Sequence, residues 1–395
     1  MAKRLFIAFV LCLVALSAMA QDGQFFEHAS DHYRVRSQVG RVHAEETALK
    51  LEAMMRLFND YFRFDPGQLP TKLNVRIFQE KADFDRYLRR VIGETRDDFT
   101  YLHYADLARS ELVGFYSEGE SFDLSLSHQG FVQFFRAFIA NPPLWLREGF
   151  AVFFEQSEYD DDFQTVIYRE NLSWLETLQS IIDGTAGADP IPLRQMLRMD
   201  VEEARRQIDV FYPQAWGVVS FLVNAPNRDI NRILWDTISA LEPRATKEEN
   251  EANIEQEVLR WLNEDFVLER FVEYVSERRS FRGLVEDGIE HYDSGRVVEA
   301  ESVFVQALQL REDSFVPHYY LGLINYDKSN HSLAEYYYNQ ALSRGADEAL
   351  TYYALGVNAF ADNRFDDAMR YLDETVEIDP GYSDKAQELI AEMEG

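Results

Sequence analysis

The stretch GLINYDKSNHSLAEYYYNQA, residues 322–341, decides the fold of the C-terminal part of the chain. In it, Gly322 stands twelve residues before Ala334. The pattern returns 34 residues earlier and 34 residues later, as Gly288 with Ala300 and as Gly356 with Ala368. Two further positions repeat in the same register, namely Phe304, Tyr338 and Leu372, and Ala307, Ala341 and Thr375. Such a period predicts pairs of antiparallel helices, whose close approach tolerates only Gly or Ala at the crossing points.

Residues 281–380 therefore resemble the tetratricopeptide (TPR) family. Pro380 stands at the position where the second helix of a repeat ends in that family. The segment GYSDKAQELIAEME, residues 381–394, is amphipathic and predicts a helix that caps the stack. We expect an all-α tetratricopeptide solenoid over residues 281–395, with three repeats and a capping helix.

The resemblance implies a groove lined by the first helix of each repeat. The nine matching positions are apolar and rich in tyrosine: Val285, Ile289, Tyr292, Tyr319, Leu323, Tyr326, Tyr353, Val357 and Phe360. This composition suits the binding of a protein or peptide segment. In the alternative, these side chains pack against the neighbouring domain or the capping helix.

The N-terminal part alternates between strand and helix patterns. Strands are expected at 32–37 and 72–79, helices at 44–62 and 81–92, and a hairpin from 111–118 and 121–126. The hairpin would lead into a helix that begins near His128, and the pattern from about 160 to 280 is helical. An α+β domain over residues 21–280 is thus expected to precede the solenoid.

Two neighbouring segments carry the candidate chemistry: SHQGFVQFF, residues 127–135, and PPLWLREGFAVFFE, residues 142–155. In a helical H-E-x-x-H motif the two histidines share one helix face and bind zinc, while the Glu acts as general base. The two segments resemble the peptidase-MA-like branch of the gluzincin zinc metallopeptidases, over roughly residues 30–275. The later DVFYPQAWGVVSFLV, residues 209–223, is similar to that family's Tyr-x-Gln-x-Trp helix, with Tyr212, Gln214 and Trp216.

The resemblance assigns the first zinc ligand to His128 and the third to Glu148. Gln129 stands where the general base is expected, and Val132 stands where the second histidine is expected. A glutamine amide does not accept the proton of water at neutral pH, and a valine does not ligate a metal. The sequence therefore predicts a catalytically inactive, metallopeptidase-like protein that needs no cofactor.

Other interpretations of the same residues stay open at this point. An active zinc metallopeptidase would use His128, Glu148 and an unidentified third ligand, for which His103 is a candidate, and Glu155 would face the same cleft. Without a metal, Ser125 or Ser127 would hold His128 by hydrogen bonds at the helix end, and Glu148 would be a buried carboxylate bonded to His128.

The first residues, MAKRLFIAFVLCLVALSAMAQD, predict a secretory signal peptide over 1–20 with cleavage after Ala20. A membrane anchor is the alternative, but the apolar run is shorter than the ~20 residues that a spanning helix needs. Cys12 is the one cysteine of the sequence, so no disulfide is expected after cleavage.

The net charge of −30 argues against nucleic acid as a partner, because an acidic surface repels phosphate. The sequence as a whole predicts an exported protein, periplasmic or secreted, that is not inserted in a membrane after cleavage. Its function would be that of a scaffold that binds a protein or peptide through the repeats. In a third interpretation, the first domain is only a platform for the repeats.

Overall fold

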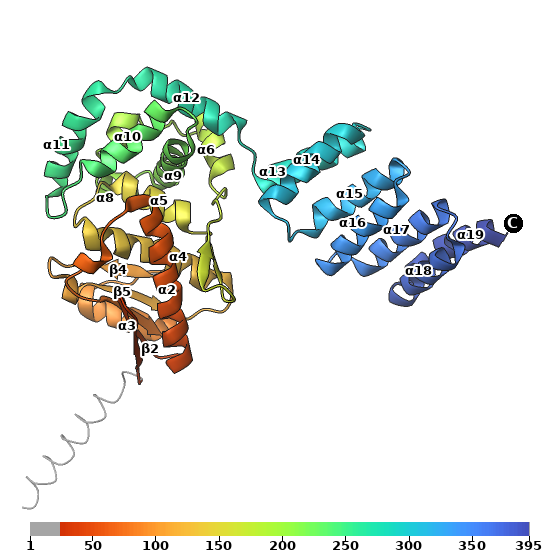
Figure 1. Cartoon of the computed structure of the whole chain (residues 1–395), viewed down its shortest axis with the longest axis horizontal. Helices are drawn as coiled ribbons and strands as arrows, with labels where there is room; N and C mark the ends of the chain where they lie inside the picture. Colours follow the sequence, from red (N-terminus) through yellow and green to blue (C-terminus); the bar gives the residue numbers. More distant parts are fainter. Residues whose placement is uncertain (1–23, 395) are drawn as a thin grey trace, which may run out of the picture. The chain divides into compact units, whose positions relative to one another are not determined.

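The computed structural model describes residues 24–394, most of which form helices (Figure 1). The predicted signal peptide, with Cys12, lies outside the described residues. The contacts within the chain divide it into two compact units between Arg278 and Arg279. No helix within residues 24–394 is long and apolar enough to cross a membrane.

The first unit contains a mixed five-stranded sheet. Its strands are β1 (Phe26–Ala29), β2 (Tyr33–Ser37), β3 (Leu73–Phe78), β4 (Thr100–Leu102) and β5 (Glu111–Phe115). They lie in the order β1-β2-β3-β5-β4. The two central pairs, β2 with β3 and β3 with β5, are parallel, whereas the edge strands β1 and β4 are antiparallel to their neighbours. The small sheet precedes a long run of helices, which agrees with an α+β unit at the level of its elements.

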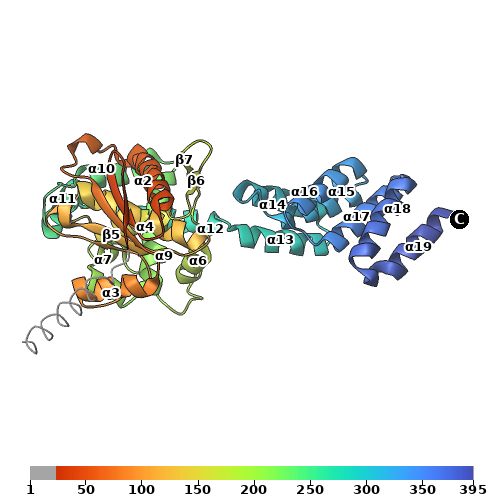
Figure 2. The ribbon, with the colours of Figure 1, turned by 90° about the horizontal axis from the view of Figure 1, so that it is seen from below.

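The helices of this unit are α2 (Arg41–Phe62), α3 (Lys81–Ile92), α4 (Glu120–Phe138), α5 (Leu144–Phe154), α6 (Leu175–Ile182), α7 (Leu193–Met196), α8 (Val201–Arg205), α9 (Ile208–Asn224), α10 (Arg228–Ser239), α11 (Lys247–Glu257) and α12 (Glu264–Glu277). In the sequence, α2 and α3 lie between strands of the sheet, and the remaining helices of this unit come after its last strand, β5 (Figure 2). The short 3-10 helices of this unit are η1 (Pro66–Gln68), η2 (Leu107–Arg109) and η3 (Leu259–Trp261). The strands β6 (Glu158–Asp160) and β7 (Thr165–Ile167) form a separate small hairpin.

The expected hairpin of 111–118 with 121–126 is wrong. β5 already has β3 on one side and β4 on the other, so residues 121–126 have no free strand edge to join. They form the first turns of α4 instead. Phe122 and Leu126 are four positions apart, so they share one face of this helix, and both are buried. In so short a segment, the same apolar positions fit both the alternation of a strand and the spacing of a helix. The pairing of β5 with β3 and β4 decides between the two.

A cluster of phenylalanines holds α2, α4 and α5 together. The ring of Phe62 on α2 lies 4.8 Å from that of Phe150 on α5, and Phe131 on α4 lies 5.8 Å from Phe150. Phe131 and Phe150 are fully buried. Close packing of this kind leaves the three helices little freedom to shift, so it fixes which polar side chains of α4 and α5 face each other.

The second unit consists of helices in antiparallel pairs. The pairs are α13 (Phe281–Asp293) with α14 (Val297–Leu310), α15 (Phe315–Asp327) with α16 (His331–Ser343), and α17 (Glu348–Ala361) with α18 (Phe365–Ile378), followed by η4 (Pro380–Tyr382) and α19 (Ser383–Glu394). The helix expected after Pro380 is confirmed as α19.

The glycines of the 34-residue period lie where the two helices of a pair meet. A Cβ atom on Gly322 would lie 2.5 Å from the ring of Tyr338, and one on Gly288 would lie 2.8 Å from the ring of Phe304. Real Cβ contacts are longer, so a larger residue forces the paired helices apart. The close approach that the sequence predicts at these positions is confirmed.

We predict that Gly322→Ala destabilises the second unit. Alanine adds ~1 kcal/mol of helix propensity, but overpacking against the fully buried Tyr338 costs ~1–3 kcal/mol. Calorimetry of the full chain should show a lower unfolding temperature for this variant, whereas Ser332→Ala, at an exposed position of α16, should leave it unchanged. An unchanged unfolding temperature in Gly322→Ala would contradict the tight crossing.

Candidate functional site

The helix that carries His128 begins earlier than the sequence suggests. α4 starts after Gly119, which has the positive φ of 85°, and its first turn contains Glu120 and Asp123, whose carboxylates favour the positive end of the helix dipole. His128 therefore lies in the third turn of α4, and its expected place at a helix start is wrong.

The two serines do not hold His128 at a helix end either. The hydroxyl of Ser125 donates a hydrogen bond to Asp98, and that of Ser127 donates one to the carbonyl oxygen of Phe154. The second bond ties α4 to the last turn of α5. It therefore contributes to the positioning of His128 through the packing of the two helices.

The close crossing of α5 and α9 positions the carboxylate of the site. A Cβ atom on Gly149 would lie 2.5 Å from the carbonyl oxygen of Ala215, so the two helix backbones touch at this point. The crossing places Tyr212 beside Glu148. Burial, and then the charge of Glu148, raise the pKa of the Tyr212 phenol well above its usual value.

His128 lies between two carboxylates of α5 and its C-terminal end. Its Nε2 is 3.6 Å from Glu148 Oε2, and its Nδ1 is 3.5 Å from Glu155 Oε1. Burial alone would lower the pKa of His128, but the hydrogen bonding and charge of both carboxylates outweigh it and raise the pKa to about 9. The imidazole is therefore protonated at neutral pH and neutralises part of the charge of its two neighbours.

Glu148 has a second cationic partner, Arg147, whose guanidinium lies 2.6 Å from Glu148 Oε1. Burial would raise the pKa of this carboxyl, but Arg147 and His128 outweigh it and lower the pKa to about 2. The side chain of Glu148 is only 9% exposed, so its charge depends on these two partners. Glu148 is thus a buried carboxylate in contact with His128, as expected for this pair.

Glu155 is held by Asn171, whose Nδ2 donates to Glu155 Oε2 over 2.8 Å. The sequence indicated that Glu155 faces the same cleft, because it stands seven residues after Glu148. It did not reveal the roles of Arg147 and Asn171. The only signal for Arg147 was its position next to Glu148, and none pointed to Asn171.

The residues present do not fit a catalytic zinc ion. Val132, at the position of the second histidine, is 7% exposed and belongs to the hydrophobic core. Of the expected ligands only His128 and Glu148 are present, 3.6 Å apart, and a catalytic zinc site has three protein ligands. Within residues 24–394, no three His, Cys, Asp or Glu side chains are grouped so as to hold a metal ion.

Gln129 and His103 do not complete the donor set. Gln129 is half-buried on α4 and has an amide where a base would stand. His103 lies near Arg136 and Arg147, and burial together with these two charges lowers its pKa to about 4. The structure thus brings together His128, Glu148 and Glu155, but it does not add His103 to them as a third ligand.

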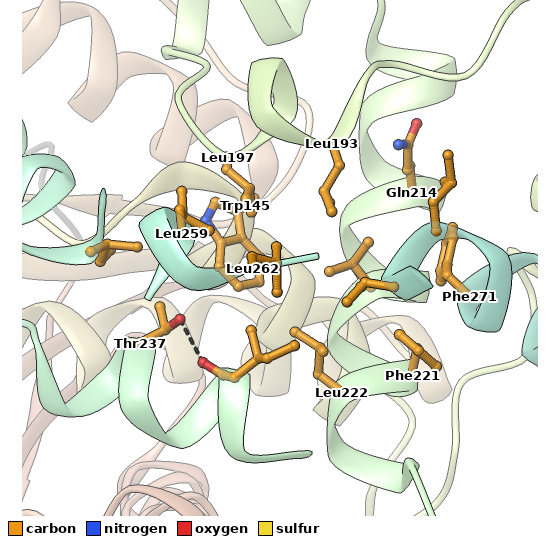
Figure 3. A pocket seen from close by; sticks show the side chains of 15 residues that line it. Trp145, Leu193, Leu197, Gln214, Phe221, Leu222, Thr237, Leu259, Leu262 and Phe271 are labelled. Carbon is orange, nitrogen blue, oxygen red and sulfur yellow. Dashed lines mark hydrogen bonds between the residues drawn. The ribbon is translucent and has the colours of Figure 1, made fainter. Parts of the chain in front are cut away.

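An apolar pocket of the first unit is lined by residues of α5, α7, α9, α10, α11 and α12 and includes none of the charged residues above (Figure 3). Its lining has no charged side chain, and the hydroxyl of Thr237 in its wall donates to the carbonyl oxygen of Ile233. Of the Tyr-x-Gln-x-Trp residues, Gln214 reaches its wall, but its amide is hydrogen-bonded to the backbone of Ile191 at both ends. Trp216 is 1% exposed and is core. The pocket therefore supplies packing and offers no group for acid–base chemistry.

The nine residues expected in a groove of the second unit lie on α13, α15 and α17, which contact one another in sequence. All nine are half-buried, so each keeps part of its surface accessible. Tyr353 contacts Tyr382, which precedes α19, with 5.2 Å between the rings, so the capping segment covers part of this row. The Tyr292 hydroxyl donates to Asp327 over 2.9 Å.

Neither the models of known protein families nor the curated protein sequences match this chain.

We predict that the buried ion pairs of His128 make stability depend on pH. The folded protein keeps the His128 proton up to about pH 9, whereas the unfolded chain releases it near pH 6.5, so the free energy of unfolding decreases as the pH rises between these values. The decrease attributable to His128 is about 3 kcal/mol at most.

Urea unfolding at several pH values, with EDTA present, tests this dependence. His128→Gln should lose the slope between pH 6.5 and 9, and His28→Gln on the edge strand β1 should retain it. Equal slopes in the His128→Gln and unchanged proteins would contradict the paired imidazolium.

Proposed function

We propose that this protein is an exported, non-catalytic relative of the peptidase-MA-like metallopeptidases, joined to a tetratricopeptide module that binds a protein segment. The observation that carries the binding role is the row of nine half-buried apolar and tyrosine side chains on α13, α15 and α17. Such side chains provide large contact areas and lose little conformational entropy when a ligand covers them.

The non-catalytic character is supported by the polar site of the first unit. The positions of a general base and a second metal ligand hold Gln129 and Val132, and the remaining candidates His128 and Glu148 satisfy each other together with Arg147. These residues hold a proton between two carboxylates and leave no basic group next to an open coordination position. In this proposal the site stabilises the packing of α4 against α5.

The ligand of the groove is best matched by a basic segment. Residues 279–395 contain 23 Asp and Glu against 9 Lys and Arg. Carboxylates such as Asp327 stand beside the tyrosine row, and burial together with neighbouring Tyr382 raises the pKa of Tyr319 to about 12, so its phenol stays neutral. Tyrosine faces and carboxylates together favour Lys and Arg side chains through cation–π and charge attraction.

The binding role can be tested with a display library of random peptides selected on the full chain. We predict that Lys- and Arg-containing sequences with aromatic residues are enriched, and that the double variant Tyr319→Ala, Tyr353→Ala weakens their binding by at least about tenfold. Tyr336→Ala serves as the control, because Tyr336 is 55% exposed on α16, outside the row. Selected peptides that bind the double variant equally well would refute the groove as the binding surface.

The non-catalytic role can be tested by elemental analysis of the purified protein. We predict that the native chain contains no stoichiometric zinc, whereas the double variant Gln129→Glu, Val132→His takes up about one zinc ion, because it restores three ligands and a base. Adding His128→Ala to that variant should remove the metal again. Stoichiometric zinc in the native protein, with hydrolysis of peptides that a chelator stops, would instead favour the active metallopeptidase.

A further inference from the structure

Arg136 continues the polar face of α4 beyond the site described above. It follows His128 and Val132 at steps of four residues, so the three side chains share one face of the helix. The guanidinium of Arg136 is half-buried, and its Nε donates to the carbonyl oxygen of Ala140 over 3.2 Å. In the part of the chain that the structure describes, no carboxylate lies within ion-pair distance of it.

Arg136 has a cationic neighbour in Arg147. Burial lowers the pKa of Arg136, and the charge of Arg147 lowers it further, to about 10, although Tyr101 and the charge of Glu148 act in the opposite direction. Both guanidiniums also contribute to the low pKa of His103. The three groups therefore share one neighbourhood, formed where α4, the start of α5 and the loop after β4 meet.

One further polar atom in this neighbourhood lacks a partner. Nδ1 of His103 is buried and has no hydrogen-bond partner among the described residues, whereas the hydroxyl of Tyr101 lies within reach of Ser110. The rings of these two residues are 5.9 Å apart, and the charge of Arg136 acts on both. The phenol and the neutral imidazole can each donate or accept a hydrogen bond, whereas the two guanidiniums only donate, so an added acceptor can bind to all four groups.

The balance of charges indicates what that acceptor is. Glu148 is shared between His128 and Arg147, and Glu155 pairs with His128, so the two carboxylates neutralise two of the three cations. The remaining positive charge belongs to Arg136. One negative charge completes the balance, and a carboxylate supplies it in the planar form that a guanidinium binds with two parallel hydrogen bonds. A phosphate dianion would leave an excess of negative charge beside Glu148.

We propose that Arg136, together with Arg147, His103 and Tyr101, forms a binding site for a carboxylate group of a ligand. A half-buried arginine without a carboxylate is costly in the free protein, and a bound carboxylate removes that cost. The carboxylate comes either from the C-terminus of a peptide or from a small carboxylic acid. The site lies in the first unit and does not depend on the groove of residues 279–395.

The first experiment measures thermal unfolding of the full chain in sodium acetate and in sodium chloride at equal ionic strength and neutral pH. Acetate should raise the unfolding temperature above its value in chloride, because it binds the folded state. Arg136→Gln should abolish this difference. Arg232→Gln, which removes a 74% exposed arginine of α10, should retain it.

The ligand-free stability of the same variants separates binding from a structural role. If Arg136 serves to bind a ligand, Arg136→Gln unfolds in chloride at the same temperature as the native protein or higher. Arg136→Lys keeps the charge without the planar fork, so it should bind acetate more weakly than the native protein does. It also provides the comparison if Arg136→Gln fails to fold.

The second experiment identifies the source of the carboxylate by calorimetric titration. The probes are acetyl-Ala-Ala-Ala with a free C-terminal carboxylate, the same peptide as its C-terminal amide, and acetate. Tighter binding of the acid peptide than of acetate, with no binding of the amide, assigns the site to a peptide C-terminus; equal binding of the acid peptide and acetate assigns it to small carboxylic acids. In either case Arg136→Gln should weaken binding by at least about tenfold.

Two results would overturn the proposal. One is that acetate stabilises the native protein no more than chloride does and that the acid peptide does not bind. The other is that Arg136→Gln and Arg136→Lys bind both probes as tightly as the native protein.

Discussion

The contact between the backbones of α5 and α9 at Gly149 is the constraint on which the polar site depends. Any side chain at this position would meet the carbonyl oxygen of Ala215, so α9 lies against α5 only because residue 149 has no Cβ. On the other side of α5, the phenylalanine cluster fixes α2 and α4. α5 is thus held between two closely packed neighbours, and the directions in which Glu148 and Arg147 point follow from that packing.

Charge determines how the side chains of this region arrange themselves once the helices are in place. Buried carboxylates and cations are stable only in combination, which is why Glu148, with 9% of its side chain exposed, has both His128 and Arg147 as partners. At the positions where the proposed relationship to metallopeptidases expects a general base and a second metal ligand, the chain has Gln129 and Val132, and His128 lies between the carboxylates of Glu148 and Glu155. The same reasoning singles out Arg136, because its charge has no such partner.

The second unit depends on a different constraint, which is local. Each glycine of the 34-residue period meets a side chain of the very next helix, as Gly322 meets Tyr338. Contacts of this kind connect neighbouring segments and repeat along the chain, so each helix pair can be understood without the rest of the protein. The tyrosines that remain half-buried on α15 and α17, Tyr319 and Tyr353 among them, keep part of their surface accessible after this packing.

The sequence by itself determined the paired helices of the second unit, the capping helix and most strands and helices before α4. Small residues at a fixed period, and apolar residues at helical or strand spacing, encode contacts that are local or repeated. The tertiary structure alone decided that residues 121–126 join α4, because the free edges of β5 were taken by β3 and β4. It also decided the partners of His128, the place of Arg147 and the isolation of Arg136. Those depend on how α4, α5 and α9 pack across long stretches of sequence, and side-chain charges far apart in the chain interact only after that packing has brought them together.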